Sequence, residues 1–355
     1  MGFFERRIHS NLEKIYDNSY VRKIGDDDSI VIFSDLHMGD GSKRDDFSKN
    51  GDLFREVLTR YYERKGYGLI LNGDVEELYK FDLPRIERRW SELFRIFNRF
   101  KKGNGLYKIY GNHDIDLTPL NGHHLETRTY GSIRLIYKGD PIFIFHGHQA
   151  SLFEDHMFLI KRIGIRYLAT PIGVMNYDVS NNNDTRFNVE SRVYNFAKNR
   201  KLLAIIGHTH RPLFESLSKG DRLAYRIESL CRRYPYADDS EKQEFERRIR
   251  DHYQALLGSN GKGAKDSSRM KVYSRGPLIP CLFNSGCAIG KRGITGLEIR
   301  KGKIRLVHWF DPSRSKKFFS YDEMEPSRLK GTGIYRLVLN SEYLDYIFAR
   351  IRLLS

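Results

Sequence analysis

The chain has 355 residues, of which 40% are hydrophobic, enough for one large domain with a substantial core and insertions. Its 61 lysines and arginines exceed its 45 acidic residues, and the net charge of +16 predicts an anionic partner. Three unpatterned cysteines, no apolar leader and no run of about 18 apolar residues argue against a disulfide-stapled secreted domain and a membrane-spanning protein, so we expect a cytoplasmic protein.

The first segment, residues 1–28, is charged and is predicted to form a helix outside the main domain. The main domain is predicted for residues 29–310, with insertions at 149–201 and 216–275. Residues 311–355 are basic and aromatic and are predicted to be a C-terminal extension.

Five short apolar runs within the main domain are each followed by residues that can bind a metal. The runs are rich in Ile, Val and Phe, as is typical of strands buried on both faces. They span residues 30–33, 69–71, 107–110, 142–145 and 203–206. Loops beyond such strand ends are where open sheets collect their ligands, so we expect the residues that follow to converge.

The residues that follow these runs are Asp, Asn and His, and no cysteine is among them. Oxygen and nitrogen donors without thiolates argue against structural zinc and suit Mn, Fe or Zn in a hydrolytic site. Asp74, on the loop after the second run, can bridge two ions at about 3.5–4 Å. We therefore expect two divalent metal ions, with Mn as the first choice and Fe or Zn as alternatives.

Taken together, the motifs resemble the calcineurin-like metallophosphoesterase superfamily. They are Asp-x-His, Gly-Asp-x-x-Glu (Gly73 to Glu77), Gly-Asn-His-Asp, His-Gly-His and Gly-His-Thr-His, spread over roughly Ile30 to His210. The resemblance implies an α/β fold, namely a four-layer αββα sandwich of two packed mixed β-sheets. Residues 280–284 and a hairpin of 296–299 with 304–307 resemble the later strands of that fold.

The same resemblance implies a role for each motif residue. One ion would be held by Asp35, His37 and His210, and the other by Asn112, His146 and His208, with Asp74 bridging them. His208 and His210 are only two residues apart, so their assignment to different ions requires the loop to kink. His146 is preferred to His148 as a ligand because it directly ends the apolar run. His148 and Arg211 are candidates for substrate binding.

His113 stands beside a ligand, and the resemblance makes it the acid that protonates the leaving alkoxide. An imidazole with a pKa near ~6.5 suits that task near neutral pH. The expected nucleophile is a hydroxide shared by the two ions. Asp114 is a second catalytic candidate, since it could fix the tautomer of a nearby imidazole. The alternative is that Asp114 caps a turn.

These features predict a metal-dependent phosphoesterase or pyrophosphatase with a phosphate-ester substrate. The apolar insert and the Gly207–Pro212 motif resemble the UDP-2,3-diacylglucosamine hydrolases of lipid A synthesis, but those enzymes have Arg where this chain has His113. A nuclease or cyclic-nucleotide phosphodiesterase is the competing hypothesis. A non-catalytic scaffold is disfavoured because every ligand position is filled.

The insertions carry their own predictions. The first half of 149–201 alternates apolar residues with Lys161, Arg162 and Arg166, which suits either a lid over an amphiphilic phosphate ester or a packed amphipathic helix. Helices are predicted from Thr185 to about Arg200, from Asp239 or Ser240 to Leu257 and from Glu342 to Leu353, and residues 258–268 have linker composition. The basic surface could face an anionic membrane or a nucleic acid.

Overall fold

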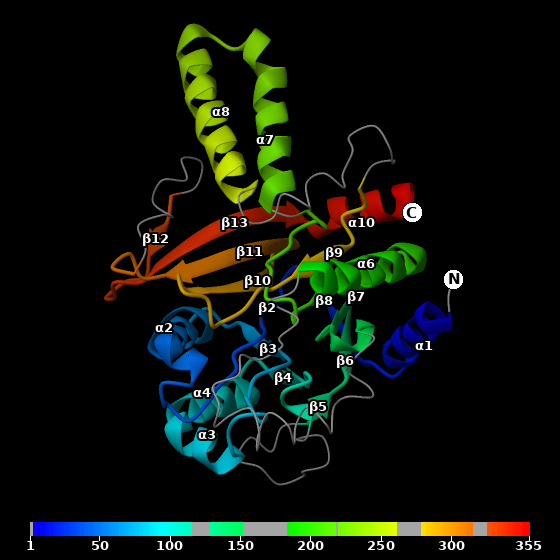
Figure 1. Cartoon of the computed structure of the whole chain (residues 1–355), viewed down its shortest axis with the longest axis vertical. Coiled ribbons are helices and arrows are strands. Elements are labelled where there is room, and N and C mark those ends of the chain that lie inside the picture. Colours follow the sequence, from blue (N-terminus) through cyan, green and yellow to red (C-terminus); the bar gives the residue numbers. More distant parts are fainter. Residues whose placement is uncertain (1–2, 116–127, 152–182, 218, 261–277, 315–324) are drawn as a thin grey trace.

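The computed structural model describes residues 3–115, 128–151, 183–217, 219–260, 278–314 and 325–355. Two β-sheets pack against each other, and helices cover their outer faces (Figure 1). This is the α/β fold with two mixed sheets that the family resemblance implied. Most of the proposed lid, residues 152–182, and most of the predicted linker lie outside the described residues.

The larger sheet has eight strands in the order β12-β13-β11-β10-β2-β3-β4-β5. Strands β2 to β5 run parallel, and β10, β11, β13 and β12 add in antiparallel fashion beside β2. Their bounds are β2 Ser29–Phe33, β3 Gly68–Asn72, β4 Leu106–Ile109, β5 Thr129–Tyr130, β10 Ile294–Arg300, β11 Lys303–Phe310, β12 Ser327–Arg328 and β13 Tyr335–Tyr343.

The smaller sheet has five strands in the order β1-β6-β7-β8-β9. Strands β7, β8 and β9 are parallel to one another, and the β6–β7 pair is antiparallel. Their bounds are β1 Tyr20–Ile24, β6 Ser132–Tyr137, β7 Asp140–Phe145, β8 Leu203–Ile206 and β9 Leu282–Asn284.

Every residue of strand β2 from Ile30 to Phe33 is apolar because both faces of the strand are buried. Ile30 and Ile32 belong to the core that includes the strands of the smaller sheet. Val31 and Phe33 point the other way and pack with residues of α2 (Gly51–Val57) and α4 (Ser91–Lys102). Successive strand residues face opposite sides of a sheet, so a strand between two apolar layers must be apolar throughout.

Helices form the outer layers. Helices α2 and α4, with the short α3 (Leu83–Arg89), lie on the side of the larger sheet. Helices α1 (Phe3–Asp17) and α6 (Asn183–Arg200) contact the smaller sheet, and α6 matches the helix predicted from Thr185 to Arg200. Among the described helices, none is both long and apolar enough to cross a membrane.

The prediction for residues 1–28 is wrong in its second half. Helix α1 ends at Asp17, and Tyr20–Ile24 forms β1, which pairs in parallel with β6. Tyr, Val and Ile favour a strand, but the partner strand lies more than a hundred residues further along the chain. The N-terminal segment is therefore part of the domain rather than an appendage.

The predicted boundary at residue 310 is also wrong. Strand β13 pairs along its length with β11, and α10 (Leu344–Leu354), which matches the helix predicted from Glu342, packs into the core. Four α10 side chains are buried: Leu344, Ile347, Phe348 and Ile351. The C-terminal region thus completes the larger sheet.

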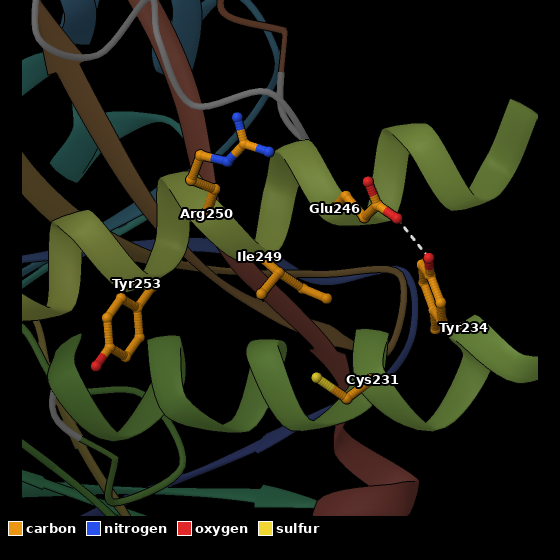
Figure 2. Close-up of a pocket in the computed structure, with 6 residues that line it drawn as sticks. All are labelled: Cys231, Tyr234, Glu246, Ile249, Arg250 and Tyr253. Atoms are coloured by element: carbon orange, nitrogen blue, oxygen red, sulfur yellow. Dashed lines mark hydrogen bonds between the residues drawn. The ribbon is translucent and has the colours of Figure 1, made fainter.

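The described part of the second insertion forms a helical hairpin that projects from the sandwich (Figure 1). Helix α8 (Asp239–Asn260) was predicted, whereas its partner α7 (Lys219–Arg233) was not. The two helices bury Leu223, Leu230 and Phe245. An open pocket between them is lined by Cys231, Tyr234, Glu246, Ile249, Arg250 and Tyr253 (Figure 2).

The integration of the C-terminal region can be tested at Phe348, which is 1% exposed, against Tyr346 on the same helix, which is 49% exposed. We expect Phe348→Ala to lower the free energy of unfolding by about 3–5 kcal/mol, because it leaves a cavity in the core. Tyr346→Ala should stay within about 0.5 kcal/mol of the wild type. Urea unfolding followed by circular dichroism measures both, and equal, small effects would contradict this account of α10.

Candidate metal centre

The metal-ligating motifs come together at the C-terminal ends of parallel strands from both sheets. The loops after β2 and β3 are joined by backbone hydrogen bonds, since the amides of Asp35 and His37 donate to the carbonyls of Gly73 (3.0 Å) and Asp74 (2.9 Å). The loops after β7 and β8 are joined likewise, because the Gly207 amide donates to the His146 carbonyl at 2.9 Å. The loops that carry the site are thus fixed to one another.

One group of ligand atoms is formed by Asp35, His37 and His210, and all of them lie within 4.8 Å of one another. The Nε2 atom of His210 lies 3.0 Å from Oδ1 of Asp35 and 3.2 Å from Nε2 of His37. These are the three residues that the family resemblance assigned to one ion.

A second group is formed by Asp74, His146 and His208, again within 4.8 Å of one another, and a third group places Asp74 with His37 and His113 in the same way. Oδ2 of Asp74 lies 3.1 Å from Nε2 of His146 and 3.8 Å from Nε2 of His37, a member of the first group. Asp74 therefore stands between the two groups, as a bridging carboxylate requires.

The donor set fits divalent cations. The amide oxygen of Asn112 is buried and accepts no hydrogen bond from the described part of the chain, and the carboxylates of Asp35 and Asp74 are buried as well. The Nδ1 atom of His146 lies 2.9 Å from the Asn72 carbonyl, to which it can only donate, so Nε2 is the ring nitrogen that can bind a cation. Several acceptors aimed at one small space are what a hard or borderline cation satisfies.

The ligand residues hold a strained backbone. Five of them have left-handed φ angles, a conformation that costs residues other than glycine about 1–3 kcal/mol each when the surroundings impose it. They are Asp35 (φ 54°), His37 (48°), Asp74 (51°), His208 (62°) and His210 (52°). The kink expected between His208 and His210 is therefore present, and it sends the two side chains to different groups.

Two glycines make room for the carboxylates. A Cβ atom at Gly111 would lie 2.1 Å from Oδ1 of Asp74, and one at Gly207 would lie 2.5 Å from Oδ2 of Asp35. No side chain can occupy those positions unless the ligand moves. The glycines of the third and fifth motifs are thus required by the packing of the site.

Opposite charges shift the pKa values at the centre. Burial alone would raise the pKa of Asp74, but the imidazoles of His146 and His113 hold it well below its usual range. Burial would lower the pKa of His146, but Asp74 raises it to about 10. A proton on His146 thus balances the buried carboxylate of Asp74, and a bound cation would replace it, because a ligating histidine must be neutral.

His113 is held by Glu77, which the sequence analysis did not include among the site residues. Oε1 of Glu77 lies 2.8 Å from Nδ1 of His113, and Oε2 lies 3.0 Å from Nδ1 of His37. Burial would raise the pKa of Glu77, but these two histidines hold it well below its usual range. The only signal for Glu77 was its place in the Gly-Asp-x-x-Glu motif.

The carboxylate of Asp114 caps a turn, which is the second of the two roles considered for it. Its carboxylate accepts hydrogen bonds from the amides of Gly111 (2.5 Å) and Val75 (2.9 Å). The carboxylate that contacts the imidazole of His113 belongs to Glu77, so the expected tautomer-fixing role of Asp114 is corrected. Asp114 instead ties the His113 turn to the loop after β3.

The two candidates for substrate binding lie in different surroundings. Arg211 forms an ion pair with the buried Glu190 of α6, a contact that the sequence did not predict. His148 is buried, with its ring 5.5 Å from that of His146, and burial and the neighbouring imidazoles lower its pKa. Of the two histidines in this motif, His146 is the one in a ligand group.

Comparison with protein families identifies the family of the chain. The model of the calcineurin-like phosphoesterase family matches residues 29–237, which is more than half of the chain. The matched range contains all five motifs. No curated protein sequence matches the chain.

The space at Gly111 yields a test of the centre. Gly111→Ala should displace Asp74 and abolish binding of at least one metal ion, with the fold retained, as measured by metal content and circular dichroism. Gly25→Ala is the matched control, because a Cβ atom there meets nothing within 4 Å. Full metal content in Gly111→Ala would show that the centre does not depend on the position of Asp74.

Proposed function

The chain belongs to the calcineurin-like phosphoesterase family, whose members are metal-dependent phosphoric ester hydrolases, and on that premise we propose that it cleaves a phosphate ester at a centre of two divalent cations. The observation that carries the proposal is the position of Asp74, within 4 Å of imidazoles from both ligand groups. A carboxylate so placed suits a shared ligand.

The proposed ligands follow the two groups. Asp35, His37 and His210 would hold one cation, Asn112, His146 and His208 would hold the other, and Asp74 would be shared between them. When bound, such cations polarise phosphoryl oxygens and lower the pKa of water, so that hydroxide becomes available near neutral pH. Mn is the expected ion, with Fe or Zn as the alternatives, since the same donors accept each of them.

His113 is the proposed catalytic acid. Its side chain is 15% exposed, against 0–6% for His37, His146 and Asp74, so a substrate can reach it. With Nδ1 held by Glu77, a proton on Nε2 can pass to the leaving oxygen as its bond to phosphorus breaks and a bond from water to phosphorus forms. The buried Glu77 carboxylate stabilises the imidazolium before transfer.

An acid at this position favours an ester over a pyrophosphate. An alkoxide is a poor leaving group until it is protonated, whereas a nucleoside monophosphate leaves as a weak base. The lipid-sugar pyrophosphatases that the chain resembles have Arg in place of His113. We therefore propose a substrate with an alcohol leaving group, either a phosphomonoester or a phosphodiester.

A nucleic-acid or cyclic-nucleotide phosphodiester is the second candidate, favoured by the net charge of +16. Contacts with several phosphates weaken steeply with salt, whereas hydrolysis of a small ester changes little. Comparing cleavage of single-stranded DNA and RNA at low and high salt separates the two candidates.

The activity itself is tested with chelated protein that is resupplied with Mn. We expect hydrolysis of p-nitrophenyl phosphate or of bis-p-nitrophenyl phosphate to return with the metal, and Asp74→Asn to reduce it by at least about 10²-fold, because the shared ligand loses its charge. The preferred compound then identifies the mono- or diester class. Metal-independent hydrolysis, or an active Asp74→Asn variant, would contradict the proposal.

The role of His113 is tested with two leaving groups. We expect His113→Ala to lower turnover of phenyl phosphate by about 10²–10⁴-fold. Its effect on p-nitrophenyl phosphate should be much smaller, since p-nitrophenolate leaves without a proton. Metal content should stay at the wild-type level. An equal loss on both substrates, or a loss of metal, would assign His113 a role other than acid.

A further inference from the structure

We propose that Glu190 of α6 is a positioning residue that holds the His208–His210 loop in the conformation that divides these two histidines between the cations. The inference rests on the proposed function, because it assumes that both histidines are ligands. Glu190 lies outside all five motifs, on the helix of the first insertion.

Glu190 contacts the residues directly before and after His210 in the sequence. Its Oε1 atom accepts a hydrogen bond from the Thr209 hydroxyl at 2.8 Å and one from Nε of Arg211 at 3.2 Å. Its second oxygen pairs with Nη2 of Arg211. Because Glu190 is only 4% exposed, water competes weakly for these bonds.

The Thr209 hydroxyl is fixed from a second side. The side-chain amide of Asn284, at the end of β9, donates to Oγ1 of Thr209 at 2.9 Å and to the Gly207 carbonyl at 2.8 Å. The hydroxyl therefore accepts from Asn284 and donates to Glu190, and its donor and one acceptor position are both used. The residue between the two histidines is thus held by β9 and by α6.

The hydrogen bonds of Glu190 and Asn284 to Thr209 matter because the His208–His210 loop has a strained backbone. His208 and His210 both have left-handed φ angles, and such conformations persist only where the surroundings impose them. Loss of the Thr209 bonds would let the segment relax toward an extended form, in which side chains two residues apart share one face. Both imidazoles would then point the same way, and one cation would lose a ligand.

Helix α6 also reaches the loop that carries His146. Nη1 of Arg192 donates to the carbonyl of Ala150 at 3.1 Å, two residues after His148, and Arg192 pairs with Glu5 of α1. One helix therefore contacts both loops that supply imidazoles to the second group. The ion pair with Arg211 offsets the cost of burying the Glu190 carboxylate at this place.

A purely structural role for Glu190 makes a different prediction. It would lower the stability of the metal-free protein when lost, with the affinity for metal unchanged in the protein that stays folded. Residues that orient metal ligands typically cost 10–100-fold in metal affinity when they are replaced. Metal affinity and metal-free stability therefore separate the two roles.

The experiment titrates the full chain with Mn²⁺ by calorimetry and electron paramagnetic resonance, and follows thermal unfolding in chelator. We expect Thr209→Val and Glu190→Ala to weaken binding of at least one Mn²⁺ by about 10–100-fold. Glu190→Gln should lose less, because its amide oxygen can still accept from Thr209. Glu13→Gln is the matched control, since it removes another ion pair of α6, with Arg200, far from the loop.

Wild-type affinity and stoichiometry in both Thr209→Val and Glu190→Ala would overturn the inference, as would an equal loss in Glu13→Gln. If Glu190→Ala does not fold, Thr209→Val decides, because it only exchanges a hydroxyl for a methyl group. Failure of the wild-type chain to bind two Mn²⁺ would instead contradict the proposed function.

Discussion

Two buried carboxylates, Asp35 and Asp74, are the constraint on which the rest of the centre depends. Removing a carboxylate from water costs several kcal/mol unless it is paired and hydrogen-bonded. Adjacent parallel strands, β2 and β3, place both at the same sheet edge. The His208 amide donates to Asp35 and the His113 amide to Asp74, and the imidazoles of His210 and His146 lie against the same two carboxylates. The arrangement is acceptable only with positive charge between the carboxylates, whether from protons or from metal ions.

The other unusual features of the site follow from bringing those charges together. Left-handed residues turn the side chains inward, and glycines leave the space into which they turn. Such loops are locally unfavourable, so rigid neighbours must hold them. Apolar cores on both faces of the larger sheet provide part of this support. Two buried carboxylates provide another part, since Glu77 contacts His37 and His113, and Glu190 contacts Thr209 and Arg211.

The sequence predicted the centre better than its surroundings. Candidate metal-ligating residues directly after short apolar runs are a local signal, and strands β2, β3, β4, β7 and β8 were predicted from it. Strands β1 and β13 were missed because their partners, β6 and β11, are recognisable only in three dimensions. The alternatives for Asp114 could not be separated without knowing which amides it meets. The sequence did not single out Glu190 as a site residue, since a glutamate on a helix rich in charged residues is common on protein surfaces.

The most direct test of the central claim is anomalous diffraction from crystals of the chain loaded with Mn²⁺. Two anomalous peaks are predicted, one contacted by Asp35, His37 and His210, the other by Asn112, His146 and His208, with Asp74 contacting both. A single peak, or peaks elsewhere in the molecule, would contradict the assignment of a two-metal centre to these strand ends.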